Sequence, residues 1–389
     1  MFMPFSKIIS IDMAKYDFLI IGAGVFGITV ARKLTDAGAR CLIVEKEPSV
    51  GGMCATEEKD GIMIHKYGEH ILHTDDDEVW DFILKYCTIN HVNKYMKCMN
   101  KNRYYSFPLT MNLFSEVYDK IYPKDMKSLI AADVKNYGVE YQRNFEEDMI
   151  YKCGYKAYSE AVRGYYEKLY GDECKNLSTA CGRDIDTRYD YSDGYYTEMH
   201  VGVPVEGYTK FLENMLGDDI DIMFNKDFIK SRESLMKLCS FAIYTGPVDR
   251  LCGYVYGPLQ WRKLDFEMKD FSSEGEHFLG IGTVRVSDPD NGLLEMTEHK
   301  SIVDTASDSN YVTFIKPGIW HQDDTGHFCV NNEESEALLD RYIAMFREEF
   351  PNVICGGRQG IYRNITICES IRLAMDLAEQ IISGLRTEA

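Results

Sequence analysis

Three glycines near the N-terminus have the spacing of a phosphate-binding turn. Gly22, Gly24 and Gly27 follow an apolar run at 16–21 and open a helical pattern, and a second apolar run ends at Glu45. The first glycine permits a tight turn, the second lets backbone N–H groups approach a pyrophosphate, and the third lets the helix pack closely on the strand. The helix N-terminus then faces the phosphates, and Glu45 is placed to accept hydrogen bonds from a ribose. The pattern predicts a dinucleotide-binding βαβ unit.

Two further glycine pairs bear on which dinucleotide binds. Gly51 and Gly52 come shortly after Glu45, where the chain would pass close to a pyrophosphate, although such a pair also marks simple turns. Gly356 and Gly357 follow another apolar run near the C-terminus, before a helix expected at about 370–382. Glycine turns at both ends of the chain favour FAD, which is long enough to contact both. We therefore predict an α/β fold with a Rossmann-like FAD-binding domain built from discontinuous segments.

Composition and charge exclude several classes of protein. The 389 residues include 43 Lys+Arg and 62 Asp+Glu, a net charge of −19, which argues against nucleic acid or an anionic membrane as a partner. No apolar run approaches the roughly 18–20 residues that span a bilayer, and the first 15 residues lack the features of a signal peptide. The 12 cysteines form no Cys-x-x-Cys pair, so we expect a reduced, cytoplasmic protein without membrane insertion.

Several blocks of sequence resemble one known family. The run His65-Lys-Tyr-Gly-Glu-His70-Ile-Leu-His73-Thr74 is similar to a signature of the bacterial UDP-galactopyranose mutases. Further blocks follow in the order of that family across nearly the whole chain: 105–112, 164–171, 202–209, 243–249, 298–300 and 356–358. The chain is thus identified as a divergent member of this family. The three histidines of the run could suggest a metal site, but no cysteine or carboxylate pattern supports one, and we predict none.

The resemblance implies a flavoenzyme that catalyses no net redox reaction. In this family N5 of reduced FAD is the nucleophile at the anomeric carbon of a nucleotide-diphosphate sugar, and the sugar ring changes between pyranose and furanose forms. The implied role is the supply of galactofuranose for polysaccharide biosynthesis, with NAD(P)H as the expected reductant. The implied architecture adds a helical bundle and a twisted antiparallel β-sheet to the FAD domain. The expected boundaries are 14–85, 200–262 and 350–389 for the FAD domain, 86–180 for the helices, and 95–110, 181–199 and 263–349 for the sheet.

The resemblance also assigns residues to the site. His70 and Arg358 are expected beside the flavin as catalytic residues. The residues expected to bind the cofactor are Gly22, Gly24, Val25, Phe26, Gly27, Glu45, Lys46, Gly52, Met53, His65, His70, Ile71, Gly357 and Arg358. The residues expected to bind substrate are Tyr165, Tyr170, Arg183, Arg188, Tyr195, Phe328 and Arg363.

Two departures from the family put the substrate in question. Asp184 and Glu295 stand where the family has arginines that bind the diphosphate, and Asn364 replaces a tyrosine. At ~4 Å and an effective dielectric constant near 20, a unit-charge contact is worth about 4 kcal/mol, so two reversals would abolish binding in the usual pose. Neighbouring cations could compensate, namely Arg183, Arg188, Arg285 and Arg363. Otherwise the substrate sits differently, the chemistry has changed, or the ungapped alignment is out of register at these sites.

Three functions remain open on the sequence. The leading prediction is a nucleotide-sugar mutase acting on a UDP-, GDP- or dTDP-linked hexose. The alternatives are an FAD-dependent oxidoreductase of the amine-oxidase or desaturase type, and a flavin-binding protein that has lost catalysis. The oligomeric state is also open, with a homodimer as one option.

Overall fold

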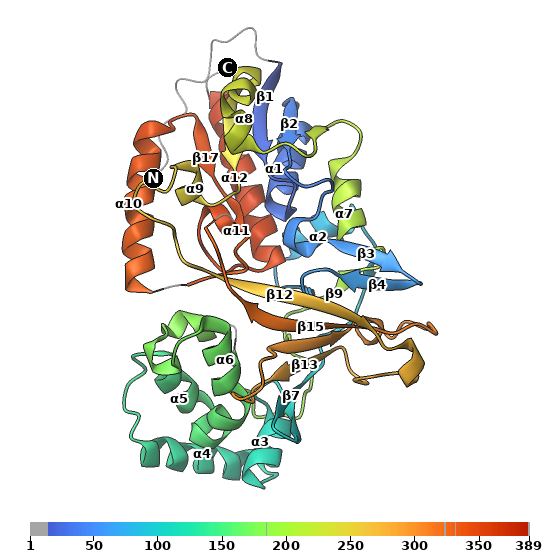
Figure 1. Cartoon of the computed structure of the whole chain (residues 1–389), viewed down its shortest axis with the longest axis vertical. Coiled ribbons are helices and arrows are strands. Elements are labelled where there is room, and N and C mark those ends of the chain that lie inside the picture. The colour runs from blue at the N-terminus through green and yellow to red at the C-terminus, as the bar shows by residue number, and fades with distance from the viewer. Residues whose placement is uncertain (1–14, 184, 323, 331, 388–389) are drawn as a thin grey trace.

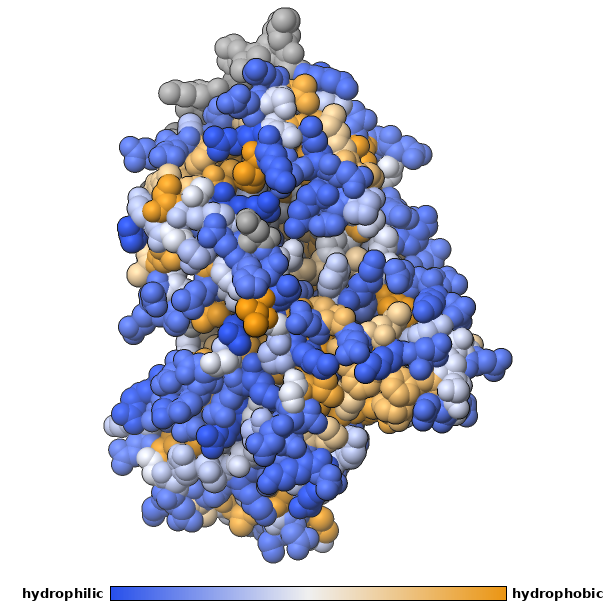
Figure 2. Space-filling view, in the orientation of Figure 1, coloured by the Kyte–Doolittle hydropathy of each residue, from blue (hydrophilic) through white to orange (hydrophobic). Residues whose placement is uncertain are grey.

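The chain folds into an α/β region, a large sheet and a group of helices. The computed structural model describes residues 15–183, 185–322, 324–330 and 332–387. Figure 1 shows the α/β region at the top, helices α3–α6 at the bottom left, and the long strands β12 and β15 crossing the molecule between them. Hydrophilic side chains cover most of the face seen in Figure 2. Among the described residues, every helix is too short or too polar to span a membrane.

The α/β region is built on a parallel five-stranded sheet. The strand order is β10 (Asp221–Met223), β2 (Cys41–Val44), β1 (Tyr16–Ile21), β11 (Cys239–Tyr244) and β17 (Val353–Cys355). The sequence predicted β1 and β2, and both are confirmed. The central strands are almost entirely buried, as expected for a parallel sheet covered on both faces. The helices of this region are α1 (Val25–Asp36), α2 (Asp77–Leu84), α7 (Gly207–Leu216), α8 (Phe228–Leu235), α9 (Val248–Leu251), α10 (Glu333–Glu349), α11 (Gly357–Gly360) and α12 (Ile367–Thr387).

Two small antiparallel sheets extend this region toward the rest of the molecule. One pairs β3 (Thr56–Lys59) with β4 (Ile62–His65). The other has the order β5 (Leu72–Thr74), β9 (His200–Pro204) and β6 (Ile89–Asn90). Together they carry the histidine-rich segment 65–74, which lies between the parallel sheet and the large sheet.

The large sheet has seven strands. Their order is β16 (Phe328–Cys329), β12 (Trp261–Asp270), β15 (Tyr311–Gly318), β14 (Glu295–Glu298), β13 (Thr283–Val286), β7 (Met96–Asn100) and β8 (Arg103–Phe107). All pairs are antiparallel except β13 and β7, which run parallel. The expectation of a wholly antiparallel sheet is therefore wrong, since the sheet is mixed. The strands β7 and β13 come from distant parts of the chain, so no hairpin fixes their relative direction.

Four helices pack against one end of this sheet. They are α3 (Met111–Tyr118), α4 (Pro123–Tyr137), α5 (Phe145–Ala157) and α6 (Arg163–Tyr170), with a π-helical turn, Tyr158–Val162, between the last two. One hydrophobic core unites them with side chains from β7 and β8. The helices and this half of the sheet therefore form one packed body.

A half-buried lysine fastens α6 to the turn between β13 and β14. The Lys168 ammonium donates hydrogen bonds to the carbonyl oxygens of Val286, Asp288, Asn291 and Leu293, over 2.6–3.0 Å. The three N–H groups of one ammonium, at least one of them shared, thus serve four backbone acceptors of an irregular turn, which would otherwise need water or other donors. The positions of β13 and β14 relative to α6 depend on this contact.

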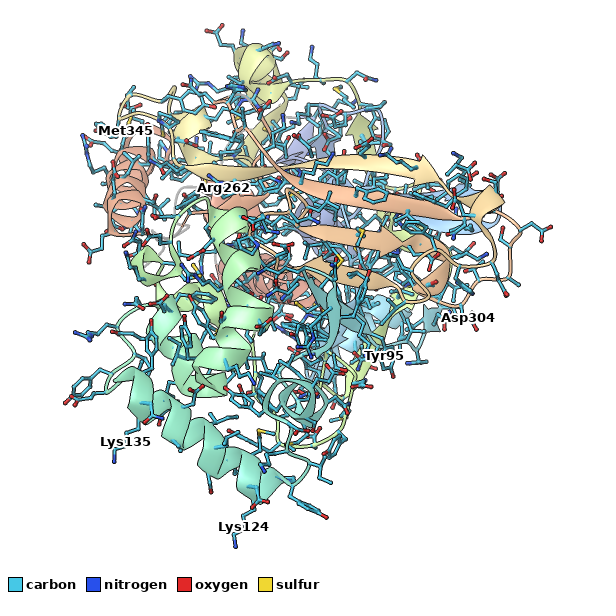
Figure 3. The ribbon with its side chains drawn as sticks, turned by 60° about the horizontal axis from the view of Figure 1, so that its bottom comes forward. Tyr95, Lys124, Lys135, Arg262, Asp304 and Met345 are labelled. Atoms are coloured by element: carbon cyan, nitrogen blue, oxygen red, sulfur yellow. The ribbon has the colours of Figure 1, made fainter. Side chains whose placement is uncertain are left out.

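Replacing this lysine should loosen the turn. We predict that Lys168→Met lowers the free energy of unfolding by about 2–4 kcal/mol, because it leaves several carbonyl groups without donors. Chemical denaturation measures the effect. Lys124→Met is the matched control, because Lys124 is exposed on α4 (Figure 3). Equal stability of the two variants would contradict the role given to Lys168.

Candidate functional site

The first glycine turn is closely packed at Gly22 and Gly27 and open at Gly24. Gly22 has a φ of +106°, and a Cβ there would lie 2.2 Å from Thr245 Oγ1. A Cβ on Gly27 would lie 2.1 Å from the Gly22 carbonyl oxygen, so this glycine lets α1 pack on the strand. A Cβ on Gly24, in contrast, would meet no atom within 4 Å. The three glycines therefore have different physical roles, as the spacing predicts.

The residues around this turn fit the pyrophosphate and ribose of a dinucleotide. Helix α1 begins after Gly24 with no side-chain cap and no acidic residue in its first turn, which leaves its N–H groups and positive dipole end available to an anion. The buried Glu45 carboxylate accepts hydrogen bonds from the N–H groups of Ala23 (2.7 Å) and Glu47 (2.9 Å). It is thereby held at the end of β2, beside the turn, with lone pairs left for a ribose.

The glycine turns from the two ends of the chain lie side by side. A Cβ on Gly356 would lie 2.4 Å from the Phe26 ring, and one on Gly357 would lie 3.2 Å from Phe26 Cβ. Gly51 joins them, because its N–H group donates to the Ala23 carbonyl oxygen over 3.0 Å. Three segments distant in sequence thus meet at one place, as a long cofactor held by both termini would require.

A chain of backbone hydrogen bonds fixes the tautomers of the buried histidines. His70 Nδ1 donates to the Gly68 carbonyl oxygen over 2.8 Å, which leaves Nε2 as the acceptor nitrogen. His65 Nδ1 accepts from the His70 N–H, and His299 Nδ1 accepts from the His65 N–H, each over 3.3 Å. Burial lowers the pKa of His70 and of His299 to about 4. These rings are neutral near pH 7, and His70 presents a lone pair and not a positive charge.

Arg358 lies close to the meeting point of the glycine turns. Its Nη2 donates to Asn364 Oδ1 over 2.9 Å, its Nη1 lies 3.6 Å from Met53 Sδ, and its guanidinium carbon is 5.4 Å from the centre of the Phe328 ring. Burial holds the pKa of Arg358 below its ordinary value, although an arginine remains charged. Asn364, which replaces the family tyrosine, thus orients Arg358.

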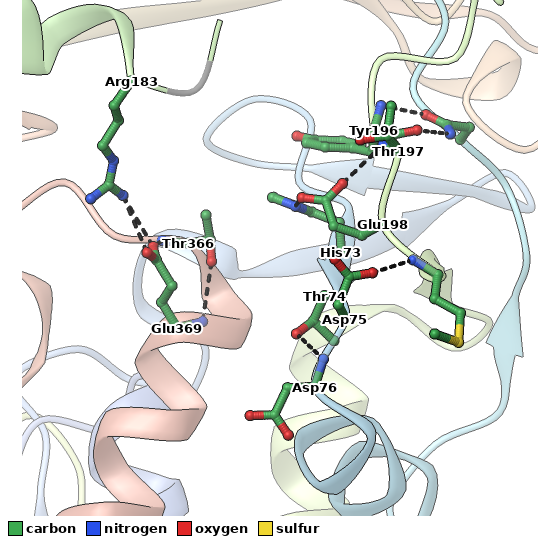
Figure 4. A network of polar contacts seen from close by, with 12 residues as sticks. His73, Thr74, Asp75, Asp76, Arg183, Tyr196, Thr197, Glu198, Thr366 and Glu369 are labelled. Atoms are coloured by element: carbon green, nitrogen blue, oxygen red, sulfur yellow. Dashed lines mark hydrogen bonds and ion pairs between the residues drawn. The ribbon is translucent and has the colours of Figure 1, made fainter. Parts of the chain in front are cut away.

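The other predicted substrate arginines do not converge on one point. Arg183 forms an ion pair with Glu369 at 3.1 Å at the start of α12, as Figure 4 shows. Arg188 donates to the Gly194 carbonyl oxygen, and the Arg363 side chain is exposed. Arg183 also donates to the carbonyl oxygen of Asn364 over 2.9 Å, the residue whose side chain accepts from Arg358. Asp184, the other acid in the place of a family arginine, lies outside the described residues.

Buried charges from the large sheet, from the loop before β7 and from the histidine segment lie in this region. Lys94 Nζ lies 3.2 Å from Glu69 Oε2, and both side chains are nearly inaccessible. Burial acts to lower the pKa of Lys94, but Glu295 and Glu69 raise it above its ordinary value. Arg285 lies on β13 beside Glu295 on β14. The same Glu295 and Lys94 charges act on His70, so the sheet and the histidine segment share one electrostatic environment.

The predicted aromatic residues form two groups. Tyr165 lies under Arg285, with the guanidinium carbon 4.2 Å from its ring centre, and Tyr195 stacks on Phe107 at 6.1 Å. Tyr170 instead lines a separate hollow of about 220 Å³ with Cys181 and Arg262 among its neighbours. Figure 2 shows the surface hollowed between α6 and α10 at this place.

Sequence reasoning missed Lys94, Glu69, Phe107 and His299. Lys94 lies in none of the recognised blocks. Glu69 and Phe107 stand inside the blocks 65–74 and 105–112 but were given no role, and only the fold shows their contacts. His299 stands inside a block that was recognised, 298–300, yet its contact with His65 is not visible from spacing. Arg285 had one signal, the alternation of Thr283, Val284, Arg285 and Val286, which places Thr283 and Arg285 on one face of a strand.

Comparison with known proteins decides the family. A model of the UDP-galactopyranose mutase family matches residues 160–364, and a model of the NAD(P)-binding Rossmann-like domain matches residues 20–86. The chain belongs to the UDP-galactopyranose mutase family. This confirms the resemblance stated from the sequence, and with it the assignment to a family of nucleotide-sugar mutases, which are isomerases.

Relatives in this family are distant but match over nearly their full lengths. The chain is 28% identical to a dTDP-fucopyranose mutase of Escherichia coli, with 94% of this chain and 98% of the relative covered. It is 25% identical to a probable UDP-galactopyranose mutase of Klebsiella pneumoniae, with 97% of each covered. A crystal structure of a reduced UDP-galactopyranose mutase matches with a TM-score of 0.72 at 13% identity, covering 95% of this chain and 96% of that one. That likeness confirms the predicted fold.

Two glycine substitutions separate cofactor binding from folding. We predict that Gly24→Ala leaves the melting temperature of the flavin-free protein within about 2 °C, because the new methyl group meets no atom, but sharply reduces the bound flavin. Gly27→Ala should lower the melting temperature itself, because its methyl group would overlap the Gly22 backbone. Thermal melts and the ratio of flavin to protein absorbance give both readings. Full flavin content in Gly24→Ala would contradict the prediction that the pyrophosphate of the cofactor passes close to this glycine.

The neutral histidines make stability depend on pH. His299 has a pKa of about 4 in the folded protein against about 6.5 when unfolded, so the unfolded chain takes up a proton first as the pH falls. Its contribution to stability is complete above pH 6.5 and is lost as the pH falls toward 4. We predict that the loss of stability between pH 6.5 and 5 is smaller in His299→Gln by up to about 2 kcal/mol. Denaturation at both pH values tests this, with exposed His321→Gln as control, and identical losses in both variants would contradict it.

Proposed function

We propose that the protein interconverts the pyranose and furanose forms of a nucleotide-diphosphate sugar, with reduced FAD as its cofactor. The observation that carries the proposal is the match of the family model to residues 160–364, which include all seven predicted substrate residues. The two relatives that match over nearly their full lengths are named for mutases of two different sugar nucleotides. UDP-galactopyranose and dTDP-fucopyranose are therefore the first candidate substrates.

The cofactor would be held by the three glycine segments. The α1 N-terminus and Gly24 would face its pyrophosphate, Glu45 its ribose, and His70 with Arg358 its flavin end. When bound and reduced, FAD supplies the N5 nucleophile for the anomeric carbon. We expect NAD(P)H to be the source of the electrons. The open surface over Gly24 and the uncapped start of α1 support this placement.

The protein side chains have two tasks in this reaction. Neutral His70 accepts a hydrogen bond at Nε2 beside the reacting groups, because its Nδ1 is already bonded to Gly68. Arg358 remains cationic in a partly buried place and stabilises negative charge that develops on the leaving diphosphate. Asn364 and Phe328 restrict the movement of the Arg358 guanidinium, so this charge is positioned before the substrate arrives.

Conversion of sugar nucleotides by the reduced protein tests the proposal. After reduction with dithionite, we predict furanose product from UDP-galactopyranose or dTDP-fucopyranose by chromatography, with no conversion by the oxidised protein and no net use of reductant. Arg358→Lys should lower kcat/KM by roughly 100-fold, because a lysine lacks the planar fork of donors. Arg347→Lys on the exposed face of α10 is the matched control.

Two outcomes would contradict the proposal. Failure of the reduced protein to isomerise any UDP-, dTDP- or GDP-linked sugar would rule out a mutase. Stoichiometric consumption of O₂ with a sugar or an amine would instead indicate an oxidoreductase, because a mutase regenerates its reduced flavin in every cycle.

A further inference from the structure

The acid at position 295 has a basic partner on the next strand. In the register of β13 and β14, Arg285 is directly opposite Glu295, and directly paired residues of antiparallel strands project from the same face with Cβ atoms about 5 Å apart. The exposed fractions are only 8% for Arg285 and 9% for Glu295. A cation therefore lies within one strand spacing of the position where the family has an arginine.

Arg285 is buried without the partners that a buried guanidinium needs. Within the described part of the chain, its Nε and Nη1 are fully buried and have no hydrogen-bond partner. No described carboxylate lies within ion-pair distance of the Arg285 guanidinium. The ion pairs found near the sheet join other residues. A buried N–H group without an acceptor costs about 1–3 kcal/mol, so the arrangement suits a group that brings acceptors for these two N–H groups.

Two aromatic rings hold the guanidinium in position. Its central carbon lies 4.2 Å from the ring centre of Tyr165 and 4.8 Å from that of Phe107. Such cation–π contacts fix the guanidinium without using its N–H groups as donors. The N–H groups remain able to form the bidentate contact that an arginine makes with a phosphate. The group is thus oriented before a ligand arrives.

We propose that Arg285 binds the diphosphate of the substrate in place of the arginine that the family carries at position 295. The cation has moved from β14 to the neighbouring residue on β13, and a long arginine side chain reaches the same space from either strand. The inference rests on the proposed function, since it assumes a nucleotide-diphosphate ligand in this site.

Glu295 is compatible with an anionic ligand because basic side chains lie near it. Lys94 and Arg285 provide two positive charges, and Glu69 and Glu295 provide two negative charges, so these four side chains sum to zero. Glu295 and Glu69 raise the pKa of Lys94 above its ordinary value although burial opposes this, which keeps the lysine charged. A diphosphate therefore meets the N–H groups of Arg285 without an uncompensated acid beside them.

Binding of nucleoside diphosphates to Arg285→Met tests the inference. Methionine keeps an unbranched apolar side chain between Tyr165 and Phe107 but removes the charge. We expect the variant to bind UDP or dTDP about 30-fold or more weakly than the wild type, with the affinity for uridine or thymidine changed less than threefold. Calorimetry measures both, and Arg347→Met is the matched control. Unchanged diphosphate affinity in a variant with normal flavin content would overturn the inference.

Moving the charge back provides an independent test. The double variant Arg285→Asn/Glu295→Arg should bind UDP or dTDP at least tenfold more tightly than Arg285→Asn alone, because it restores the family cation on β14. Arg285→Lys, which keeps the charge without the planar fork, should fall between the wild type and Arg285→Met, and it serves if the methionine variant does not fold. Failure of the double variant to recover any affinity for UDP or dTDP would contradict the proposal that Arg285 on β13 replaces the family arginine on β14.

The outcome for Arg285 can be told apart from the outcome for the proposed function. If the wild type isomerises no sugar nucleotide, yet UDP or dTDP binding is lost in Arg285→Met, the site stands and the proposed reaction fails. If the wild type isomerises a sugar nucleotide and Arg285→Met keeps its diphosphate affinity, the reaction stands and the role of Arg285 fails.

Discussion

The candidate site depends on charges that are buried where the large sheet meets the histidine segment. Lys94 and Glu69 are fixed to each other at 3.2 Å, and Glu69 also accepts a hydrogen bond from Thr283 on β13. Charged groups tolerate burial only when partners of opposite sign or hydrogen bonds compensate the lost water. The 65–70 segment is therefore held both to the loop before β7, through Lys94, and to β13, through Thr283, because moving it away would leave the buried Glu69 carboxylate without partners.

The two walls of the site differ in electrostatic character. On the side of the histidine segment, burial keeps His65 and His70 neutral by lowering their pKa values, and hydrogen bonds with backbone groups fix which ring nitrogen accepts. On the side of the sheet, acidic and basic side chains lie together, and although burial opposes it, Glu295 raises the pKa of both Lys94 and Arg285. A neutral wall with defined acceptors suits a cofactor ring, and a charged wall suits a diphosphate.

The sequence predicted the local part of this design and missed the part set by tertiary structure. The run from Tyr16 to Glu45 could be assigned because a glycine turn, a helical period and two apolar strands are all encoded within about thirty residues. Arg285 and Lys94 could not be placed in the same way. Their neighbours depend on the parallel pairing of β13 with β7, which joins distant segments without a hairpin and leaves no mark in the spacing of either strand.

The charge reversal at Glu295 shows how a family can keep its fold while its ion pairs are rearranged. In a β-sheet, a functional group must project from the correct face, and neighbouring strands offer alternative positions on that face about 5 Å apart. An arginine on β13 can therefore supply what an arginine on β14 supplies, provided that the vacated position does not leave an uncompensated charge. Glu295 meets that condition because it acts on Lys94 and Arg285 together. Position 295 alone would indicate a lost anion site, whereas the same face of the sheet still carries a cation on the neighbouring strand.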